Sequence, residues 1–249
     1  MDRWVRGALG IHENNHHALK YFFKLVEERN LKNTIEFGTY RGASLLAAAL
    51  LKDQLGFSRD SVTIGIDSFS GFPQESEFDS ISLFKNLYDA NLISQDHFEK
   101  VQLNLEIRDR FASGVGVTEI SNSSDFSDTS QNLLDDKIKY LKFSHKVETI
   151  KLDFSKEIRS LLARFEGILF DGVLIDCDLY RGYVSSLDFC KKKLKVGGIA
   201  YLDEYFSLKF PGPRIAVNHF LKENVNEFEL VECSDQADDF ERWYLVRLK

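Results

Sequence analysis

The sequence predicts an α/β fold in which helices cover a mostly parallel sheet. Two short apolar runs, 172–175 and 198–202, have the length and composition of buried strands. The segment between them carries apolar residues at three- and four-residue spacing, as a sheet-covering helix does: Val184, Leu187, Cys190 and Leu194. Gly197 and Gly198 are expected to end this helix. A strand, a crossover helix and a second strand make a unit whose two strands run parallel.

The other segments fit the same architecture. In chain order, helices are expected at 12–30, 45–52, 155–165 and 214–223, and strands at 61–66, 147–152, 228–232 and 243–248. A further strand ends near residue 37, just before the helix at 45–52. The last two strands are expected to pair as an antiparallel hairpin at one end of the sheet.

Length and composition favour one domain over residues 1–249. The chain has 249 residues, of which 43% are hydrophobic and 29% charged, as in a soluble globular protein. Its middle, about 74–146, is longer than a strand-to-helix connection needs and is interpreted as an insertion. Residues 78–111 have the pattern of one or two amphipathic helices. Residues 112–132 are rich in Gly, Ser, Asn and Asp, which leaves a mobile lid and plain disorder as alternatives.

Charge and cysteine usage exclude several classes of protein. The net charge of −7 and the lack of a basic stripe argue against a nucleic-acid-binding surface. No apolar stretch is long enough to span a membrane, and residues 1–15 lack the apolar core of a signal peptide. The three cysteines show neither a disulfide framework nor a zinc pattern. We therefore expect a cytoplasmic location, and the composition leaves open whether the chain forms a homo-oligomer.

Acidic residues follow both strands of the central unit. Asp176 and Asp178 come after the first strand, and Asp203 and Glu204 come after the second. Because the strands are parallel, these acids emerge at the same edge of the sheet, where open α/β sheets bind ligands. Converging carboxylates repel one another, so either one of them keeps a proton or a hard cation lies between them. Single acids at such positions are also common as solvated loop residues or helix caps, but two clusters favour a cation site.

A second group of residues predicts a nucleoside site. Glu36, Gly38 and Gly42 form an E-x-G-x-x-x-G turn between a strand and a helix. The glycines permit a tight turn, and a carboxylate at the loop entrance would repel a pyrophosphate but suits a cationic ligand. The sulfonium and ammonium groups of S-adenosylmethionine make such a ligand. Asp67 ends the next strand, where an acid accepts hydrogen bonds from ribose hydroxyls.

Four motifs in this order carry a resemblance to a known family: IEFGTYRGAS, IDSFSGFP, LIDCDLY and YLDEY, followed by Arg214. Together they resemble the macrocin O-methyltransferase family of sugar-modifying enzymes. The resemblance implies a Rossmann-like class I methyltransferase fold, with an antiparallel C-terminal strand and a helical or lid insertion. It also implies that S-adenosylmethionine donates the methyl group, that Mg²⁺ positions the acceptor, and that the acceptor is a hydroxylated small molecule, such as a sugar or a sugar-bearing intermediate.

The resemblance also assigns residues. The metal ligands are expected to be Asp176, Asp203 and Glu204, and Asp176 is also expected to be the catalytic base. The cofactor is expected to contact Glu36, Gly38, Thr39, Tyr40, Arg41, Gly42, Ser44, Asp67, Ser68, Asp153, Phe154 and Asp176. The sequence departs from the family at Glu204, which replaces an aspartate, at Cys177, which replaces a glycine, and at 152–154, where a glycine-aromatic turn is usual.

Two other functions stay open at this point. One is a methyltransferase without a metal, with a protonated acid in the cluster and His145 as base. The other is a non-catalytic nucleoside-binding scaffold. The presence of both Glu36 and Asp67 disfavours the scaffold, and metal chelation would distinguish the two enzymes.

Overall fold

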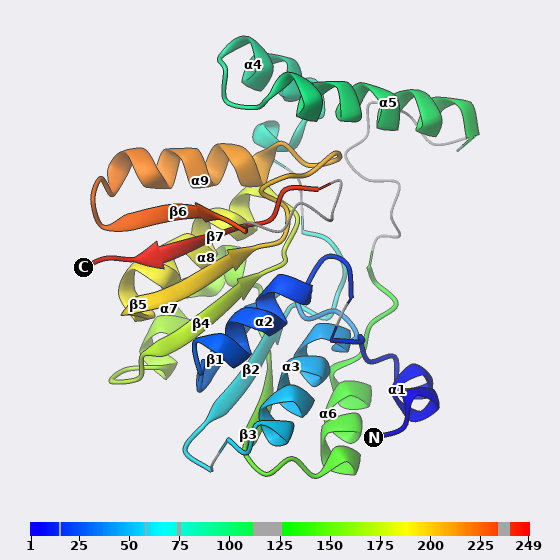
Figure 1. Cartoon of the computed structure of the whole chain (residues 1–249), viewed down its shortest axis with the longest axis vertical. Coiled ribbons are helices and arrows are strands. Elements are labelled where there is room, and N and C mark those ends of the chain that lie inside the picture. Colours follow the sequence, from blue (N-terminus) through cyan, green and yellow to red (C-terminus); the bar gives the residue numbers. More distant parts are fainter. Residues whose placement is uncertain (15, 58, 74–75, 112–125, 234–239) are drawn as a thin grey trace.

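A seven-stranded sheet forms the centre of the computed structural model, which describes residues 1–14, 16–57, 59–73, 76–111, 126–233 and 240–249 (Figure 1). The strands are β1 (Asn33–Phe37), β2 (Val62–Asp67), β3 (Lys146–Lys151), β4 (Phe170–Ile175), β5 (Leu194–Leu202), β6 (Phe228–Glu232) and β7 (Trp243–Arg247). Their spatial order is β3-β2-β1-β4-β5-β7-β6. The first five run parallel, and β7 is antiparallel to both β5 and β6. The predicted fold class and the C-terminal hairpin are thus confirmed.

Helices cover both faces of this sheet, as the two main apolar clusters show. One cluster joins β4 and β5 to α2 (Lys20–Glu28), α3 (Ala43–Gln54) and α6 (Gln131–Leu141). The other lies on the opposite face and joins the strands to α7 (Phe154–Arg164), α8 (Tyr180–Lys193) and α9 (Gly212–Glu223). Successive side chains of a strand point to opposite faces, so a sheet buried on both sides needs nearly continuous apolar strands. The predicted strands have this composition.

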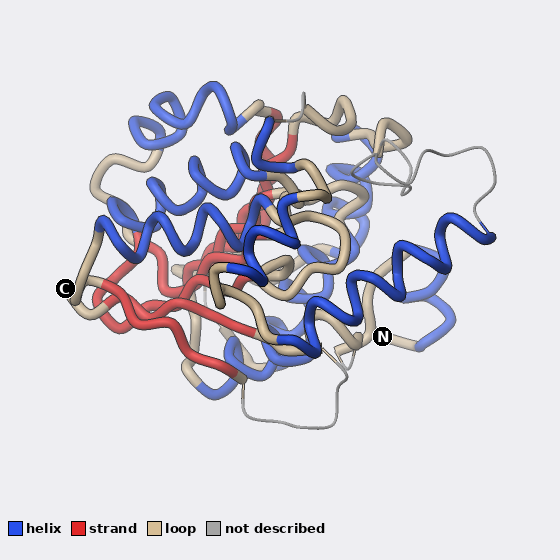
Figure 2. The backbone as a smooth tube through the Cα atoms, turned by 90° about the horizontal axis from the view of Figure 1, so that it is seen from above, coloured by secondary structure: helices blue, strands red, loops and turns tan. Residues whose placement is uncertain are grey.

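A helical arm lies beyond α9 at the edge of the sheet that β6 closes (Figures 1 and 2). It contains the 3₁₀ turn η1 (Glu77–Asp79), α4 (Leu83–Asp89) and α5 (Gln95–Phe111), and the last two lie where one or two helices were expected. Polar contacts join it to the loop after β5 and to α9. His97 Nε2 lies 2.7 Å from the Ser207 carbonyl, and Arg214 Nε donates to the Leu92 carbonyl at 3.0 Å.

One more helix, α1 (Arg3–Leu9), lies near the N-terminus. None of the described helices is long and apolar enough to span a membrane.

Two helix boundaries differ from the sequence prediction by more than two residues. The helix expected at 12–30 begins only at Lys20, because residues before it form turns closed by bonds such as the Leu19 amide to the His16 carbonyl.

The crossover helix α8 ends at Lys193, well before Gly197 and Gly198. Both glycines lie in β5, where Gly197 has a φ of 79°. There a Cβ on Gly198 would lie 3.0 Å from the Asp171 carbonyl oxygen, so close strand packing explains that glycine. Val184 is 44% exposed and does not belong to the buried stripe of α8.

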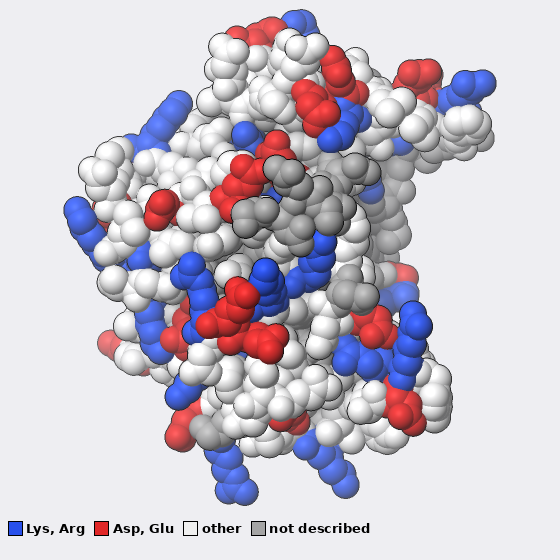
Figure 3. Space-filling view, in the orientation of Figure 1, with Lys and Arg blue, Asp and Glu red and all other residues white. Residues whose placement is uncertain are grey.

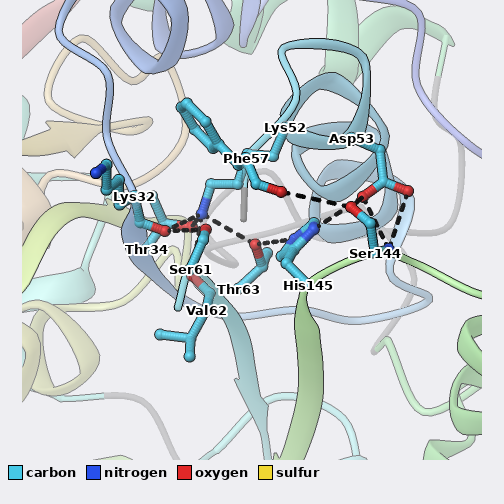
Figure 4. A network of polar contacts seen from close by, with 10 residues as sticks. All are labelled: Lys32, Thr34, Lys52, Asp53, Phe57, Ser61, Val62, Thr63, Ser144 and His145. Carbon is cyan, nitrogen blue, oxygen red and sulfur yellow. Dashed lines mark hydrogen bonds and ion pairs between the residues drawn. The ribbon is translucent and has the colours of Figure 1, made fainter. Parts of the chain in front are cut away.

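A buried polar network fastens the N-terminal ends of β1 and β2 to α3 (Figure 4). The Lys52 ammonium is fully buried and donates to Thr34 Oγ1 at 2.7 Å and to Thr63 Oγ1 at 3.0 Å. It also donates to the carbonyls of Lys32 and Val62. The network continues from Thr63 to His145, whose Nδ1 lies 3.0 Å from Asp53 Oδ1. These polar groups satisfy one another at the sheet edge opposite to the predicted site.

Candidate functional site

A cavity of about 490 Å³ lies at the carboxyl ends of the parallel strands. Its walls combine the loops after β1, β2, β3, β4 and β5, as the strand order requires for a site at this edge. Most of the residues that the sequence assigns to the site line this cavity: Gly38, Thr39, Tyr40, Ser44, Asp67, Ser68, Asp153, Phe154, Asp176, Asp203 and Glu204. Glu36, Arg41 and Gly42 do not line it.

Three acids form a tight cluster in the cavity wall. One carboxylate oxygen each from Asp176, Asp203 and Glu204 lies within 4.8 Å of the other two. Backbone hydrogen bonds fix the strand ends that carry them, since the Asp176 amide donates to Phe37 and the Asp203 amide donates to Ile175, both at 3.0 Å. The structure therefore brings together the three residues that were expected to bind a metal ion.

The cluster is electrostatically strained without a cation. Burial raises the pKa of Asp176 well above its usual value, and the charges of Asp203, Asp178 and Glu36 raise it further. Burial likewise raises the pKa of Glu204, and the three neighbouring aspartates add to this effect. Both carboxyl groups therefore favour the protonated form more than free acids do, and a positive charge beside them would act in the opposite direction.

Asp178 lies beside this cluster without being part of it. Its carboxyl group lines the same cavity, and its backbone has a φ of 61°. Burial, followed by the charge of Asp203, raises the pKa of Asp178 to about 7. The nearby Lys209 ammonium acts in the opposite direction.

A glycine and an aspartate shape the loop after β1. Gly38 has a φ of 93°, and a Cβ at this position would lie only 1.7 Å from the Asp176 carbonyl oxygen. The Asp67 carboxylate accepts hydrogen bonds from the amides of Tyr40 and Phe69, both at 2.7 Å. These bonds hold Asp67 at the cavity wall with lone pairs left for a further donor.

Glu36 lies beneath the cavity floor rather than at the loop entrance. It is 4% exposed, and Ser44, which does line the cavity, donates to its Oε1 at 2.5 Å. Burial, countered by this hydrogen bond, raises the pKa of Glu36 to about 8, and the charges of Asp67 and Asp203 contribute. Glu36 can thus affect a cationic ligand only through Ser44 or through its charge.

Arg41 and Gly42 face away from the cavity. Arg41 is exposed and forms an ion pair with Asp128. Gly42 has a φ of 82° and packs against α6, where a Cβ would lie 2.2 Å from Leu134 Cδ1. Arg41 therefore holds the loop against the segment that precedes α6, and Gly42 holds it against α6 itself.

Of the predicted lid at 112–132, residues 112–125 lie outside the described part of the chain. Phe126 lines the cavity, with its ring centroid 5.1 Å from that of Tyr40 and 4.7 Å from that of Phe72. Thr129 Oγ1 donates to the Tyr40 carbonyl at 2.6 Å. Residues 126–132 are thus bound to the loop after β1. Deleting all of 112–132 would therefore remove Phe126 from the cavity wall and disturb the loop after β1 as well.

His145, the alternative base, lies at the wrong edge of the sheet. It directly precedes β3, whereas the acids follow the carboxyl ends of β4 and β5. Its ring is buried between Thr63 and Asp53 in the network described above (Figure 4). His145 therefore cannot act as a base on a substrate in this cavity.

The cavity also has lining residues that the sequence reading missed. They include His12, Phe72, Phe126 and Lys156. Phe72 lies in the motif IDSFSGFP and Phe126 in the predicted lid, but neither was assigned to the site, and His12 was expected only as the start of a helix. On the face shown in Figure 3, basic and acidic side chains are interspersed, so charge patterning offered no further signal there.

Comparison with known proteins gives matches in structure but not in sequence. No protein-family model matches the chain, and no curated protein matches it. The structure of the O-methyltransferase NovP is similar with a TM-score of 0.56 at 17% identity, over 93% of this chain and 78% of NovP. CalS11, a calicheamicin methyltransferase, is similar with a TM-score of 0.59 at 16% identity, over 99% of this chain and 80% of CalS11. The chain has the class I methyltransferase fold.

A second structure of CalS11, described as a TDP-rhamnose 3′-O-methyltransferase in its apo state, gives a TM-score of 0.54 at 16% identity, over 94% of this chain and 81% of that one. At these identities the likeness is one of fold. In this chain, the acids that follow β4 and β5 lie beside the loops after β1 and β2 in one cavity. This arrangement is seen in the chain's own residues and does not depend on the comparison.

Proposed function

We propose that the protein is an S-adenosylmethionine-dependent O-methyltransferase that acts on a hydroxyl group of a small molecule, with Mg²⁺ bound at the acid cluster. The observation that carries this proposal is that Asp176, Asp203 and Glu204 share one cavity with Gly38 and Asp67. A cation site and a nucleoside site in one cavity suit a reaction that joins a methyl donor to a hydroxyl group. The structural similarity to NovP and CalS11 supports the same class of reaction.

The residues of the cluster fit a hard divalent cation. All three offer carboxylate oxygens, which Mg²⁺ prefers. Asp203 Oδ1 is buried and has no hydrogen-bond partner among the described residues, which is costly unless a ligand compensates it. When bound, Mg²⁺ would supply the positive charge that lowers the pKa of an acceptor hydroxyl.

The chain's own residues would orient the reactants and move the proton. Asp67 would accept hydrogen bonds from the ribose hydroxyls of the donor, and Gly38 would let the donor approach the backbone. The acceptor oxygen would attack the methyl carbon while the carbon–sulfur bond breaks, leaving the thioether S-adenosylhomocysteine. Asp176 would take the hydroxyl proton, since it is the acid at the end of the strand next to β1.

The acceptor is proposed to be a sugar or a sugar-bearing intermediate. One similar structure is that of a TDP-rhamnose 3′-O-methyltransferase, so TDP-rhamnose is a suitable first probe. Vicinal hydroxyl groups of a sugar could complete the oxygen ligands of a cation that three carboxylates only partly surround.

Two experiments test this function. Calorimetry should detect S-adenosylhomocysteine binding and no binding of NAD, because the acidic cavity disfavours a pyrophosphate. Incubation with TDP-rhamnose, S-adenosylmethionine and Mg²⁺ should then give a product heavier by one methylene group in mass spectrometry. Binding of NAD in place of S-adenosylhomocysteine would refute the proposal, whereas binding of S-adenosylhomocysteine without turnover would point to another acceptor or to a non-catalytic scaffold.

A further inference from the structure

His12 lines the cavity and is held there by defined contacts, although it lies outside the sheet. Its side chain lines the cavity, and its ring stacks on that of His16 with centroids 3.8 Å apart. Its amide donates to the carbonyl of Ala43, in the first turn of α3, at 3.1 Å. Arg6 is 7% exposed, and its guanidinium donates to the His12 carbonyl and, at 3.2 Å, to Asn14 Oδ1.

The imidazole of His12 is neutral at physiological pH. Burial lowers the pKa of His12 to about 4, and the adjacent His16 contributes. A neutral imidazole still offers one N–H donor, so it can bind an anion by a hydrogen bond without bringing a charge into the cavity.

S-adenosylmethionine carries one carboxylate, and most of the cavity would repel it. Among the described lining residues, six are acids: Asp67, Asp153, Asp176, Asp178, Asp203 and Glu204. The basic ones are His12 and Lys156, and the Lys156 ammonium lies 2.7 Å from Asp153 Oδ2 in an ion pair. His12 is therefore the basic side chain of this wall that no acid already engages through a described contact.

The strand order agrees with this assignment. Asp153 follows β3 and Asp67 ends β2, whereas Asp176 follows β4 on the other side of β1. A donor whose ribose bonds to Asp67 would have its amino-acid end toward β1 and β4. There the first turn of α3, which contains no acidic residue, lies next to His12.

We infer that His12 binds the carboxylate of S-adenosylmethionine by an imidazole N–H hydrogen bond. The inference rests on the proposed function and adds to it a binding residue from the N-terminal segment. Arg6 acts as a positioning residue, because it holds the backbone of His12 and does not line the cavity.

The test compares two donors that differ only in the carboxylate. Calorimetry would measure binding of S-adenosylmethionine and of its decarboxylated form to the wild type and to the variants His12→Ala and His17→Ala. His17 is a matched control, since it is exposed and does not line the cavity. A hydrogen bond to a charged group is worth enough that His12→Ala should weaken S-adenosylmethionine binding by roughly tenfold to a hundredfold. Its affinity for the decarboxylated form should change less than about twofold.

The outcomes separate the possible errors. Equal loss of affinity for both donors would mean that His12 only supports the fold of the wall, which would overturn the inference. An unchanged affinity for S-adenosylmethionine would overturn it as well. If the wild type binds neither donor, the proposed function itself fails. A thermal unfolding curve for each variant would confirm that the compared proteins are folded.

Discussion

Two hydrogen bonds join the Tyr183 hydroxyl to Glu204 in the interior of the protein. The hydroxyl donates to Glu204 Oε2 at 2.7 Å and accepts from the Glu204 backbone amide at 3.0 Å. Tyr183 is fully buried on α8, so the pair ties the acid cluster at the end of β5 to the crossover helix. One of the three proposed metal ligands is therefore oriented by a residue that cannot itself reach a substrate.

Tyr183→Phe should weaken Mg²⁺ binding while keeping the aromatic packing. Loss of a group that orients a metal ligand typically costs ten- to a hundredfold in metal affinity, and we expect an effect of about tenfold here. Mg²⁺ titration by calorimetry measures it. Tyr205→Phe is the matched control, because the Tyr205 hydroxyl bonds to Asn218 at 3.0 Å instead. Equal effects of the two variants would show that Tyr183 does not orient the site.

Removal of the metal should abolish methyl transfer. A chelator should stop turnover, Mg²⁺ should restore it, and Ca²⁺ should restore it poorly because its longer bonds loosen the geometry. Product formation by mass spectrometry measures this, and full turnover in excess chelator would exclude a metal role. In that case one of the carboxyl groups with a raised pKa would have to act in its protonated form.

Substitutions in the acid cluster should separate metal binding from proton transfer. Asp203→Asn and Glu204→Gln should lower Mg²⁺ affinity, so high Mg²⁺ should partly restore their rates. Asp176→Asn should lose about a hundredfold or more at every Mg²⁺ concentration, because it removes a proposed base as well as a ligand. Full rescue of Asp176→Asn by Mg²⁺ would limit Asp176 to metal binding.

Gly38→Ala should abolish cofactor binding. Its Cβ would lie 1.7 Å from the Asp176 carbonyl oxygen, so the loop after β1 or the turn after β4 must move. Gly56→Ala is the matched control, since Gly56 also has a positive φ, of 72°, but no atom within 4 Å of its Cβ position. Calorimetry with S-adenosylhomocysteine should therefore detect binding to Gly56→Ala alone, and equal binding by both variants would contradict the close approach.

Lys52→Met should destabilise the fold far from the cavity. The substitution leaves Thr34, Thr63 and two carbonyl groups without their buried donor, which should cost about 3 kcal/mol of unfolding free energy. Urea unfolding measures it, with Lys139→Met as control because Lys139 is exposed and pairs only with Asp136 among its described contacts. A difference below about 1 kcal/mol between the two variants would contradict a structural role.

The same variant tests the protonation of Lys52. Burial lowers the pKa of Lys52 in the folded chain to about 7, although Asp171 partly compensates. In the unfolded chain a lysine keeps its proton up to about pH 10.4. Between these values the unfolded state binds more protons, so this lysine makes stability rise with pH, by at most about 1.4 kcal/mol per pH unit. The advantage of the wild type over Lys52→Met should therefore grow from pH 7 to pH 10.

Local patterns predicted much of the fold and the acid cluster. The run at 172–175 and the acids after it are neighbours in sequence, and parallel pairing of β4 with β5 follows from the crossover helix. Asp176, Asp203 and Glu204 thus meet because of a topology that local patterns reveal. The end of α8 was mispredicted because Gly197 and Gly198 were taken as a helix stop, whereas both lie in β5, where Gly197 has a positive φ and Gly198 is closely packed.

Other features depend on how the chain folds back on itself, and periodicity and motif spacing do not reveal them. His12 reaches the cavity because Arg6 and Ala43 hold its backbone. The depth of Glu36 depends on Ser44, which covers it. Similarly, the sequence left His145 open as a base, but this residue precedes β3 and so lies at the edge of the sheet opposite to the carboxyl ends of the strands.

The position of β7 has a consequence for synthesis of the chain. Trp243–Arg247 is translated after the six other strands, yet it lies between β5 and β6. Until it emerges from the ribosome, β5, which leads to Asp203 and Glu204, is an unprotected edge, open to pairing with other chains. A nascent or prematurely terminated product that lacks Trp243–Arg247 should therefore recruit chaperones or aggregate, and the acid cluster should become competent only when that strand has been inserted.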